Sequence, residues 1–225
     1  TKIGLKGSVE KITCIGIDWN KNAGTEFYVV GYYPSVGLWI GLDAVNVPSS
    51  EYSAKRWIKE LLELNYKWKP DYIYADEGYG HTIIEDVKYQ SYTLRSKKNK
   101  SAMDEQTILI ADRLVSFNFS ANVVLKDPVT NKDIKKLGKH FLVENAIRTM
   151  QEGLFLFSNE DNTLREQFFN YKILRRNPQN NKPVYGKANE QIGDHRLDAF
   201  MLALGGLVLE ESVYSGRQMM PSVPT

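Results

Sequence analysis

Apolar positions over the first third of the chain follow the spacing of strands, then of one helix. Three short β-rich runs joined by turn residues, 11–19, 26–34 and 38–47, predict an antiparallel meander. The spacing then becomes helical after Ser50, which we expect to be the N-cap, and a fourth strand follows at 72–76. A strand that follows such a crossover helix is expected to run parallel to a strand of the meander.

The remaining residues predict further strands and helices. The β-prone run 87–94 is interpreted as a fifth strand, and an apolar helix within 192–204 closes the pattern. Between them we expect helices at 101–114, 140–153 and 162–171, and hairpins at 117–136 and 171–187. These elements predict one α/β domain over residues 1–225, with a mixed central sheet flanked by helices, an auxiliary β-hairpin and a flexible tail at 212–225.

Composition narrows the class of protein. A chain of 225 residues with 42% hydrophobic content can bury a sizeable core. The single cysteine, Cys14, excludes an internal disulfide and suits a reducing compartment. No apolar run approaches the roughly 18 residues that a membrane span needs, and the first residues lack an apolar signal core, so we expect no secretion signal. The net charge of +2 decides little, so the placement of the charges matters more.

Acidic residues end two of the predicted strands. Asp18 and Asp76 each follow an apolar strand, and parallel neighbours would present both carboxylates at one edge of the sheet, where ligands collect in α/β folds. Asp198 lies one turn into the last helix, on the same helical face as Asp194 and His195. If that helix packs on the sheet, Asp198 lies beside the other two aspartates.

Three gathered carboxylates repel one another, and hard divalent cations such as Mg²⁺ and Mn²⁺ relieve the repulsion. Two ions about 3.5–4 Å apart can activate a water and stabilise the leaving oxygen of a phosphodiester. Asp194, His195 and Glu77 are further candidate ligands. Each residue also has a plainer interpretation, because strand-end acids usually serve turns and Asp194 could be an N-cap. Their combination and order favour a metal site.

A resemblance rests on three quoted stretches. The meander beginning IGIDW, the strand ending YADEGYG and the C-terminal DHRLDAFMLAL together resemble the ribonuclease H-like nuclease superfamily. Within it the chain is similar to the nuclease domain of the large terminase subunit of tailed bacteriophages. In that family an Asp ends the first strand, an acid precedes Gly-x-Gly, and H-x-x-D-A opens the last helix. The matching residues here are Asp18, Asp76 with Gly78 and Gly80, and His195 with Asp198 and Ala199.

The resemblance implies a metal-dependent endonuclease that cuts concatemeric double-stranded viral DNA during genome packaging. Asp18, Asp76 and Asp198 would be catalytic ligands of two Mg²⁺ or Mn²⁺ ions, and the cut would leave 3′-hydroxyl and 5′-phosphate ends. The family also implies an N-terminal ATPase domain, a small terminase subunit, the portal of the procapsid and the host cytoplasm. The chain has no G-x-x-x-x-G-K-[ST] and no initiator Met. We therefore expect it to be one domain of a longer polypeptide, with the ATPase domain outside this chain.

Basic residues gather in three stretches, 87–103, 126–140 and 171–187. Any one of them could simply keep a protein soluble. Together they favour a duplex-binding groove beside the metal site, with phosphate contacts that do not read bases. The hairpin at 171–187 is the first choice for touching or gating DNA. The candidate DNA-binding residues are Lys97, Lys98, Lys100, Lys172, Arg175, Arg176, Lys182 and Lys187.

Other functions stay open from the residues alone. A Holliday-junction resolvase or a transposase core would use the same carboxylates. A catalytically silent DNA-binding or assembly module would keep the fold without the chemistry. A sugar-kinase-like ATPase of related topology is disfavoured, because the phosphate-binding loops are missing.

Overall fold

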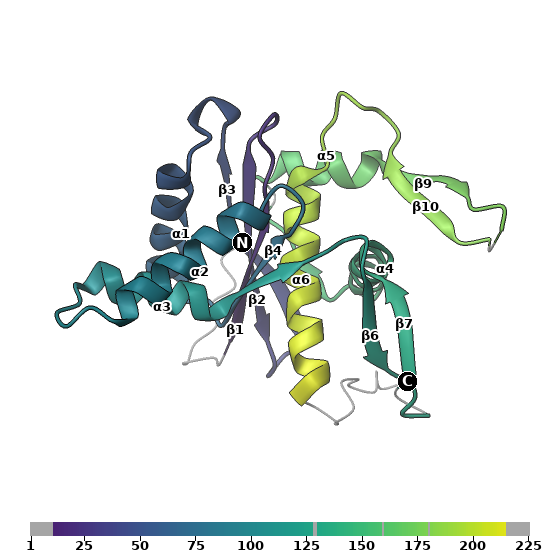
Figure 1. Ribbon diagram of the computed structural model, residues 1–225. Helices are drawn as coiled ribbons and strands as arrows, with labels where there is room; N and C mark the ends of the chain where they lie inside the picture. Colours follow the sequence, from purple (N-terminus) through teal and green to yellow (C-terminus); the bar gives the residue numbers. More distant parts are fainter. Residues whose placement is uncertain (1–10, 128–129, 159, 180, 215–225) are drawn as a thin grey trace.

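A computed structural model of the chain describes residues 11–127, 130–158, 160–179 and 181–214, with side chains as far as residue 210 (Figure 1). Its centre is a six-stranded sheet in the order β5-β4-β1-β2-β3-β8. The antiparallel meander is β1 (Ile12–Asp18), β2 (Thr25–Tyr33) and β3 (Leu38–Val47). Parallel strands extend it on both sides: β4 (Tyr72–Asp76), β5 (Leu114–Phe117) and β8 (Phe155–Leu156). The expected mixed sheet is confirmed.

Helices cover both faces of this sheet. One face carries α1 (Ala54–Trp68), α2 (His81–Arg95) and α3 (Ala102–Arg113), and the other carries α4 (Gly138–Gln151), α5 (Asn162–Asn170) and α6 (His195–Tyr214). Successive residues of a strand point to opposite faces, so Ile15 and Ile17 pack toward α1–α3 while Cys14 packs toward α6. Within the described part of the chain, none of the helices combines the length and apolar character that crossing a membrane would require.

Helix α6 lies unusually close to the central strand β1. Gly16, on the α6 side of β1, has no side chain to separate the two backbones, and a Cβ there would lie 1.9 Å from the Ala199 carbonyl oxygen. The contact fixes α6 directly over β1. It also sets the first turn of α6 beside the carboxyl end of that strand, where His195 contacts Asp18.

Two local predictions need correction, and strand β5 was missed. The run 87–94 is not a strand: it belongs to α2, whose buried residues Ile83, Ile84 and Val87 have helical spacing. The N-cap of α1 is Ser53, whose side chain accepts the Arg56 N–H, whereas Ser50 lies in a short 3-10 turn, Ser49–Glu51. Strand β5 was not predicted, because it follows α3 without an intervening turn.

The two predicted hairpins are confirmed as separate two-stranded sheets. The first pairs β6 (Asn122–Lys126) with β7 (Asp133–Leu137), and the second pairs β9 (Tyr171–Arg176) with β10 (Pro183–Lys187). Both stand away from the central sheet on the α6 side, as Figure 1 shows. Helix α6 continues through the first residues of the predicted flexible tail, and the rest of that tail, 215–225, lies outside the described residues.

Candidate functional site

Strands β1 and β4 end side by side and bring two aspartates together. Their parallel register pairs Ile17 with Ala75, so Asp18 and Asp76 occupy the next position on each strand. The alternation of side chains places both on the α6 face. Both are buried, at 5% and 9% exposure. The expected meeting of the two strand-end acids is therefore confirmed.

Helix α6 adds a third buried aspartate. Asp198 lies in its first turn and is 8% exposed. Burial raises the pKa of Asp198 to about 7; the ammonium of Lys139 opposes this shift, and the charges of Asp18 and Asp194 add to it. Burial likewise raises the pKa of Asp76 to about 6, with a contribution from the charge of Asp18 that a hydrogen bond to the Gly78 backbone partly offsets. The cluster is thus short of positive charge.

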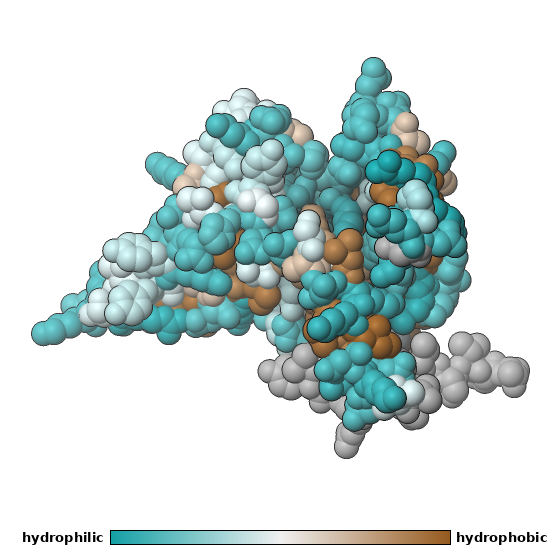
Figure 2. Space-filling view, turned by 45° about the vertical axis from the view of Figure 1, so that its right-hand side comes forward, coloured by the Kyte–Doolittle hydropathy of each residue, from teal (hydrophilic) through white to brown (hydrophobic). Residues whose placement is uncertain are grey.

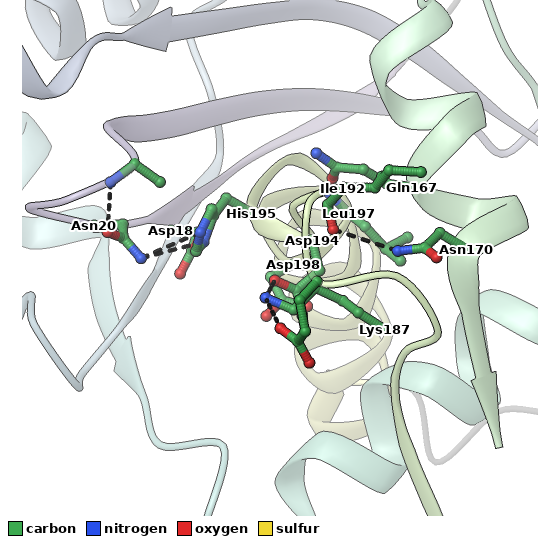
Figure 3. Close-up of polar contacts among 12 residues, drawn as sticks. Asp18, Asn20, Gln167, Asn170, Lys187, Ile192, Asp194, His195, Leu197 and Asp198 are labelled. Atoms are coloured by element: carbon green, nitrogen blue, oxygen red, sulfur yellow. Dashed lines mark hydrogen bonds and ion pairs between the residues drawn. The ribbon is translucent and has the colours of Figure 1, made fainter. Parts of the chain in front are cut away.

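His195 holds Asp18 from the start of α6. Its Nδ1 lies 2.7 Å from Asp18 Oδ2, and Asn20 Nδ2 lies 3.2 Å from Nε2 (Figure 3). The side-chain oxygen Oδ1 of Asn20 already accepts the backbone N–H groups of Asn22 and Ala23, so the side-chain NH₂ group faces the imidazole. In this arrangement Nδ1–H donates to Asp18 and Nε2 accepts from Asn20. The bond to Asp18 raises the pKa of His195 although burial opposes the shift.

Lys139 is a site residue that the sequence did not single out. It belongs to the basic stretch 126–140, but its Nζ lies 2.5 Å from Asp198 Oδ1. Burial alone would lower the pKa of Lys139, yet the charge of Asp198 raises it. The contact joins residues 59 positions apart, so no local pattern could have predicted it.

Asp194 and Glu77 flank the cluster. The backbone carbonyl of Asp194 accepts the Asp198 N–H at 2.8 Å, while its carboxylate lies 3.4 Å from Lys187 Nζ. The first-turn N–H of Leu197 is satisfied by Gln167 Oε1 at 2.8 Å, so α5 helps to cap α6 (Figure 3). Glu77 is half-buried next to Asp76, with Oε1 3.9 Å from His81 Nδ1.

An open groove of about 490 Å³ begins at the cluster. Asp76 and Glu77 line one end, and the exposed side chains of Tyr79 and His81 line its wall. Phe119 lines it as well and lies 4.6 Å from Lys139 Nζ, measured to the ring centroid. Of the three clustered aspartates, Asp76 is the one that the groove connects with the surface.

The basic stretches lie in different places. The base of the β9–β10 hairpin contacts the site, because Tyr171 lies against Lys139 and Lys187 pairs with Asp194. The loop with Lys97, Lys98 and Lys100 joins α2 to α3 at the opposite end of the molecule from that hairpin, as Figure 1 shows. The expectation of one groove that gathers all three basic stretches beside the site is wrong for this loop. The other candidates, Lys172, Arg175, Arg176 and Lys182, are exposed on the hairpin.

The donor set suits a hard divalent cation. Three buried carboxylates, two with raised pKa, are oxygen ligands that lack enough positive charge. Among the described residues, however, no three His, Cys, Asp or Glu side chains are arranged to hold one metal ion. Asp18 is engaged by His195 and Asp198 by Lys139. A bound ion would have to take over these carboxylates from their present partners.

Comparisons with known proteins bear on the fold. Neither a protein-family model nor a curated protein matches the chain. Among solved structures, the large terminase of a thermophilic bacteriophage superposes with a TM-score of 0.54 and 14% identity, covering 88% of this chain and 40% of that one. The large terminase nuclease of a second thermophilic phage, G20c, with bound cobalt superposes with a TM-score of 0.51 and 15% identity, covering 87% and 81%. This chain thus spans about two fifths of the first terminase, and it has the ribonuclease H-like fold of the large terminase nuclease domains.

Proposed function

We propose that this chain is a divalent-metal-dependent endodeoxyribonuclease that cleaves double-stranded viral DNA concatemers during genome packaging. The observation that carries the proposal is the buried cluster of Asp18, Asp76 and Asp198, which β1, β4 and α6 assemble at one edge of the sheet. The likeness to the cobalt-bound nuclease of phage G20c supports a metal at such a site.

In the proposed reaction Asp18, Asp76 and Asp198 would hold two Mg²⁺ or Mn²⁺ ions. When bound, such ions lower the pKa of a water and offset charge on the phosphate and the leaving oxygen. His195 orients the Asp18 carboxylate, and Asp194 and Glu77 are further candidate ligands beside the cluster. The water would lose a proton and its oxygen would bond to phosphorus as the P–O3′ bond breaks. The leaving O3′ would take up a proton, so the products would be a 3′-hydroxyl and a 5′-phosphate.

DNA would reach the cluster along the side that carries the β9–β10 hairpin. Lys172, Arg175 and Arg176 are exposed on β9, the base of which contacts the site. Figure 2, turned to bring this side forward, shows a hydrophilic surface interrupted by apolar patches. Strand β9 also exposes Ile173 and Leu174. Cationic side chains on such a surface bind the phosphate backbone and give binding without sequence preference.

We further propose that the nuclease acts within a large terminase. The thermophilic bacteriophage terminase of which this chain covers about two fifths has also been solved in complex with ADP. An ATPase domain of the same polypeptide, a small terminase subunit and the procapsid portal are the partners that this role requires, in the cytoplasm of the host.

The test is nicking of supercoiled plasmid in Mn²⁺. Asp18→Asn and Asp198→Asn should each abolish nicking while leaving DNA binding in EDTA largely intact, because the side-chain volume stays and only the negative charge is lost. Asp86→Asn, which changes an exposed acid on α2, is the matched control and should cut at the wild-type rate. Wild-type rates in both site variants would refute the proposal.

A second substrate separates the proposed role from that of a resolvase. A terminase nuclease should cut linear duplex at least as well as a four-way junction. Strong preference for the junction would instead assign the same carboxylates to a junction resolvase. Absence of cutting on every substrate, together with retained binding, would indicate a catalytically silent module.

A further inference from the structure

Lys139 is placed against two local preferences. It is the second residue of α4, Gly138–Gln151, where the helix dipole favours acids and disfavours cations. Its side chain is only 22% exposed, and a poorly hydrated ammonium is costly unless it is paired. Residues that break local rules in this way tend to mark functional positions.

The surrounding backbone holds Lys139 at this point. Its N–H donates to the Phe119 carbonyl at 2.9 Å, and the N–H of Gly138 donates to the Ala121 carbonyl at 2.7 Å. The ammonium lies 4.6 Å from the Phe119 ring and 5.5 Å from the Tyr171 ring, measured to the centroids. Two rings and a fixed backbone therefore direct Nζ toward Asp198.

The bond from Lys139 occupies a carboxylate that the proposed function assigns to a metal. Lys139 Nζ lies 2.5 Å from Asp198 Oδ1, and Asp198 is only 11% exposed at its side chain, so one cation at that oxygen crowds out another. His195, by contrast, contacts Asp18 and does not reach this oxygen. Lys139 is therefore the cation that a divalent ion would have to displace from Asp198 Oδ1.

We propose that Lys139 is an internal cation that neutralises Asp198 in the metal-free protein and competes with the second divalent ion for that carboxylate. The inference rests on the proposed function, because it concerns the same two-ion site. It makes Lys139 a positioning residue that controls how much metal is needed to complete the site. An ion held by Asp18 and Asp76 would be affected less, because Lys139 acts on Asp76 only through its charge and donates its hydrogen bond to Asp198.

The test is calorimetric titration of Mn²⁺, with thermal unfolding as a second readout. In Lys139→Gln the weaker binding event should tighten by between about 5- and 150-fold, the range of ordinary coupling free energies. Lys139→Arg should weaken it, because guanidinium forms a stronger, two-pronged bond to a carboxylate. Lys136→Gln is the matched control: it removes the same charge nearby, from an exposed pair with Glu144, and should leave both binding events unchanged.

A second background identifies the carboxylate. In Asp198→Asn the weaker binding event should disappear, and adding Lys139→Gln should then change nothing. Equal Mn²⁺ affinities in the wild type and Lys139→Gln, or weaker binding in the variant, would overturn the role of Lys139 while leaving the metal site standing. No Mn²⁺ binding in any variant would overturn the proposed function itself. If Lys139→Gln does not fold, Lys139→Arg still decides, since unchanged or tighter binding of the second ion contradicts the proposal.

Discussion

The carbonyl oxygen of Ala199 lies 1.9 Å from the point that a Cβ on Gly16 would occupy, and the Ala203 amide nitrogen lies 2.5 Å from it. Both contacts are backbone, so neither can rotate away. Gly16→Ala should therefore push α6 off β1 and lower the free energy of unfolding by at least about 3 kcal/mol, the upper range for overpacked cores. Urea denaturation at neutral pH measures the change.

Loss of that contact should also disturb the site, because Asp198 adjoins Ala199 in the first turn of α6. The matched control is Gly193→Ala, where the nearest atom to an added Cβ is 3.6 Å away. That variant should unfold within about 1 kcal/mol of the wild type, because a Cβ at the half-buried Gly193 makes only ordinary van der Waals contacts. Equal stability of Gly16→Ala and wild type would mean that the close packing of helix on strand is not required.

Arg196 stabilises the other side of the first turn of α6. Its guanidinium lies 3.0 Å from Glu26 Oε2 and 3.0 Å from Asp161 Oδ1, and all three side chains are largely buried. Arg196→Met would leave two buried carboxylates without a cationic partner and should cost about 3–5 kcal/mol. Lys67→Met, which breaks an exposed pair with Asp43, should cost no more than about 1 kcal/mol.

The cost of Arg196→Met should depend on pH. Burial already raises the pKa of Glu26, and the Arg196 charge opposes that shift. Without the arginine the pKa rises further, so the carboxyl group stabilises the fold while protonated and destabilises it as pH rises through the folded-state pKa. The deficit should therefore be larger at pH 8 than at pH 5. A deficit that does not change with pH would show that lost packing, rather than unpaired charge, causes it.

Duplex DNA should bind to the β9–β10 hairpin and not to the α2–α3 loop at the opposite end of the molecule. Replacing Lys172, Arg175 and Arg176 by Gln should lower the slope of log affinity for duplex DNA against log salt by roughly 2–3, at about 0.9 per lost phosphate contact. The matched variant replaces Lys97, Lys98 and Lys100, which lie on the α2–α3 loop, and should change the slope little. Equal losses in the two variants would mean that DNA binding is not localised on the hairpin.

The sequence predicted the part of the site that depends on strand ends. Asp18 and Asp76 each close an apolar strand, and parallel pairing brings such ends together whatever the details of packing. Asp198 could be predicted as a site residue because its helix is apolar apart from the first turn. Lys139 was not found, because its neighbours in KDIKKLGKH are equally basic and only a contact across 59 residues distinguishes it.

The errors in secondary structure have a similar cause. Tyr89 and Tyr92 made 87–94 look like a strand, but both side chains are exposed, and the buried residues of α2 are Ile83, Ile84, Val87 and Ser91 at helical spacing. Tertiary packing of this face on α3 overrides the β propensity of the exposed one. The cap of α1 was misplaced by one turn because serine is a favoured N-cap at either position, and Ser50 instead lies in the 3-10 turn Ser49–Glu51.

His195 offers a spectroscopic test of the bond to Asp18. That bond raises the pKa of His195, so its stabilising contribution is fully present below about 6.5 and is lost as pH rises through the higher folded-state value. In Asp18→Asn the imidazole should titrate at lower pH. Two-dimensional NMR of the three histidines measures this directly, with His81 and His140 as internal references. An unchanged titration of His195 would show that Asp18 does not engage it in solution.

Asp76→Asn should stabilise the metal-free protein while weakening its response to metal. The wild-type pKa of about 6 lies above the ordinary 3.8, so Asp76 favours the fold while protonated and opposes it as pH rises through 6. At pH 8 the variant should gain on the order of 2 kcal/mol, or roughly 5 °C in Tm, because the buried charge is gone. At pH 4.5 the two proteins should unfold at similar temperatures.

In Mn²⁺ at pH 8 the wild type should become more stable than Asp76→Asn. Cation binding requires the deprotonated carboxylate, so the rise in wild-type Tm caused by Mn²⁺ should grow between pH 5 and pH 8. Asp76→Asn should show a smaller rise that changes less over the same interval. Asp86→Asn, on the exposed side of α2, controls for the loss of one negative charge and should follow the wild type. If Asp76→Asn is less stable than the wild type without metal at pH 8, Asp76 is held by partners that compensate its charge, and the cluster has no deficit for a metal to fill.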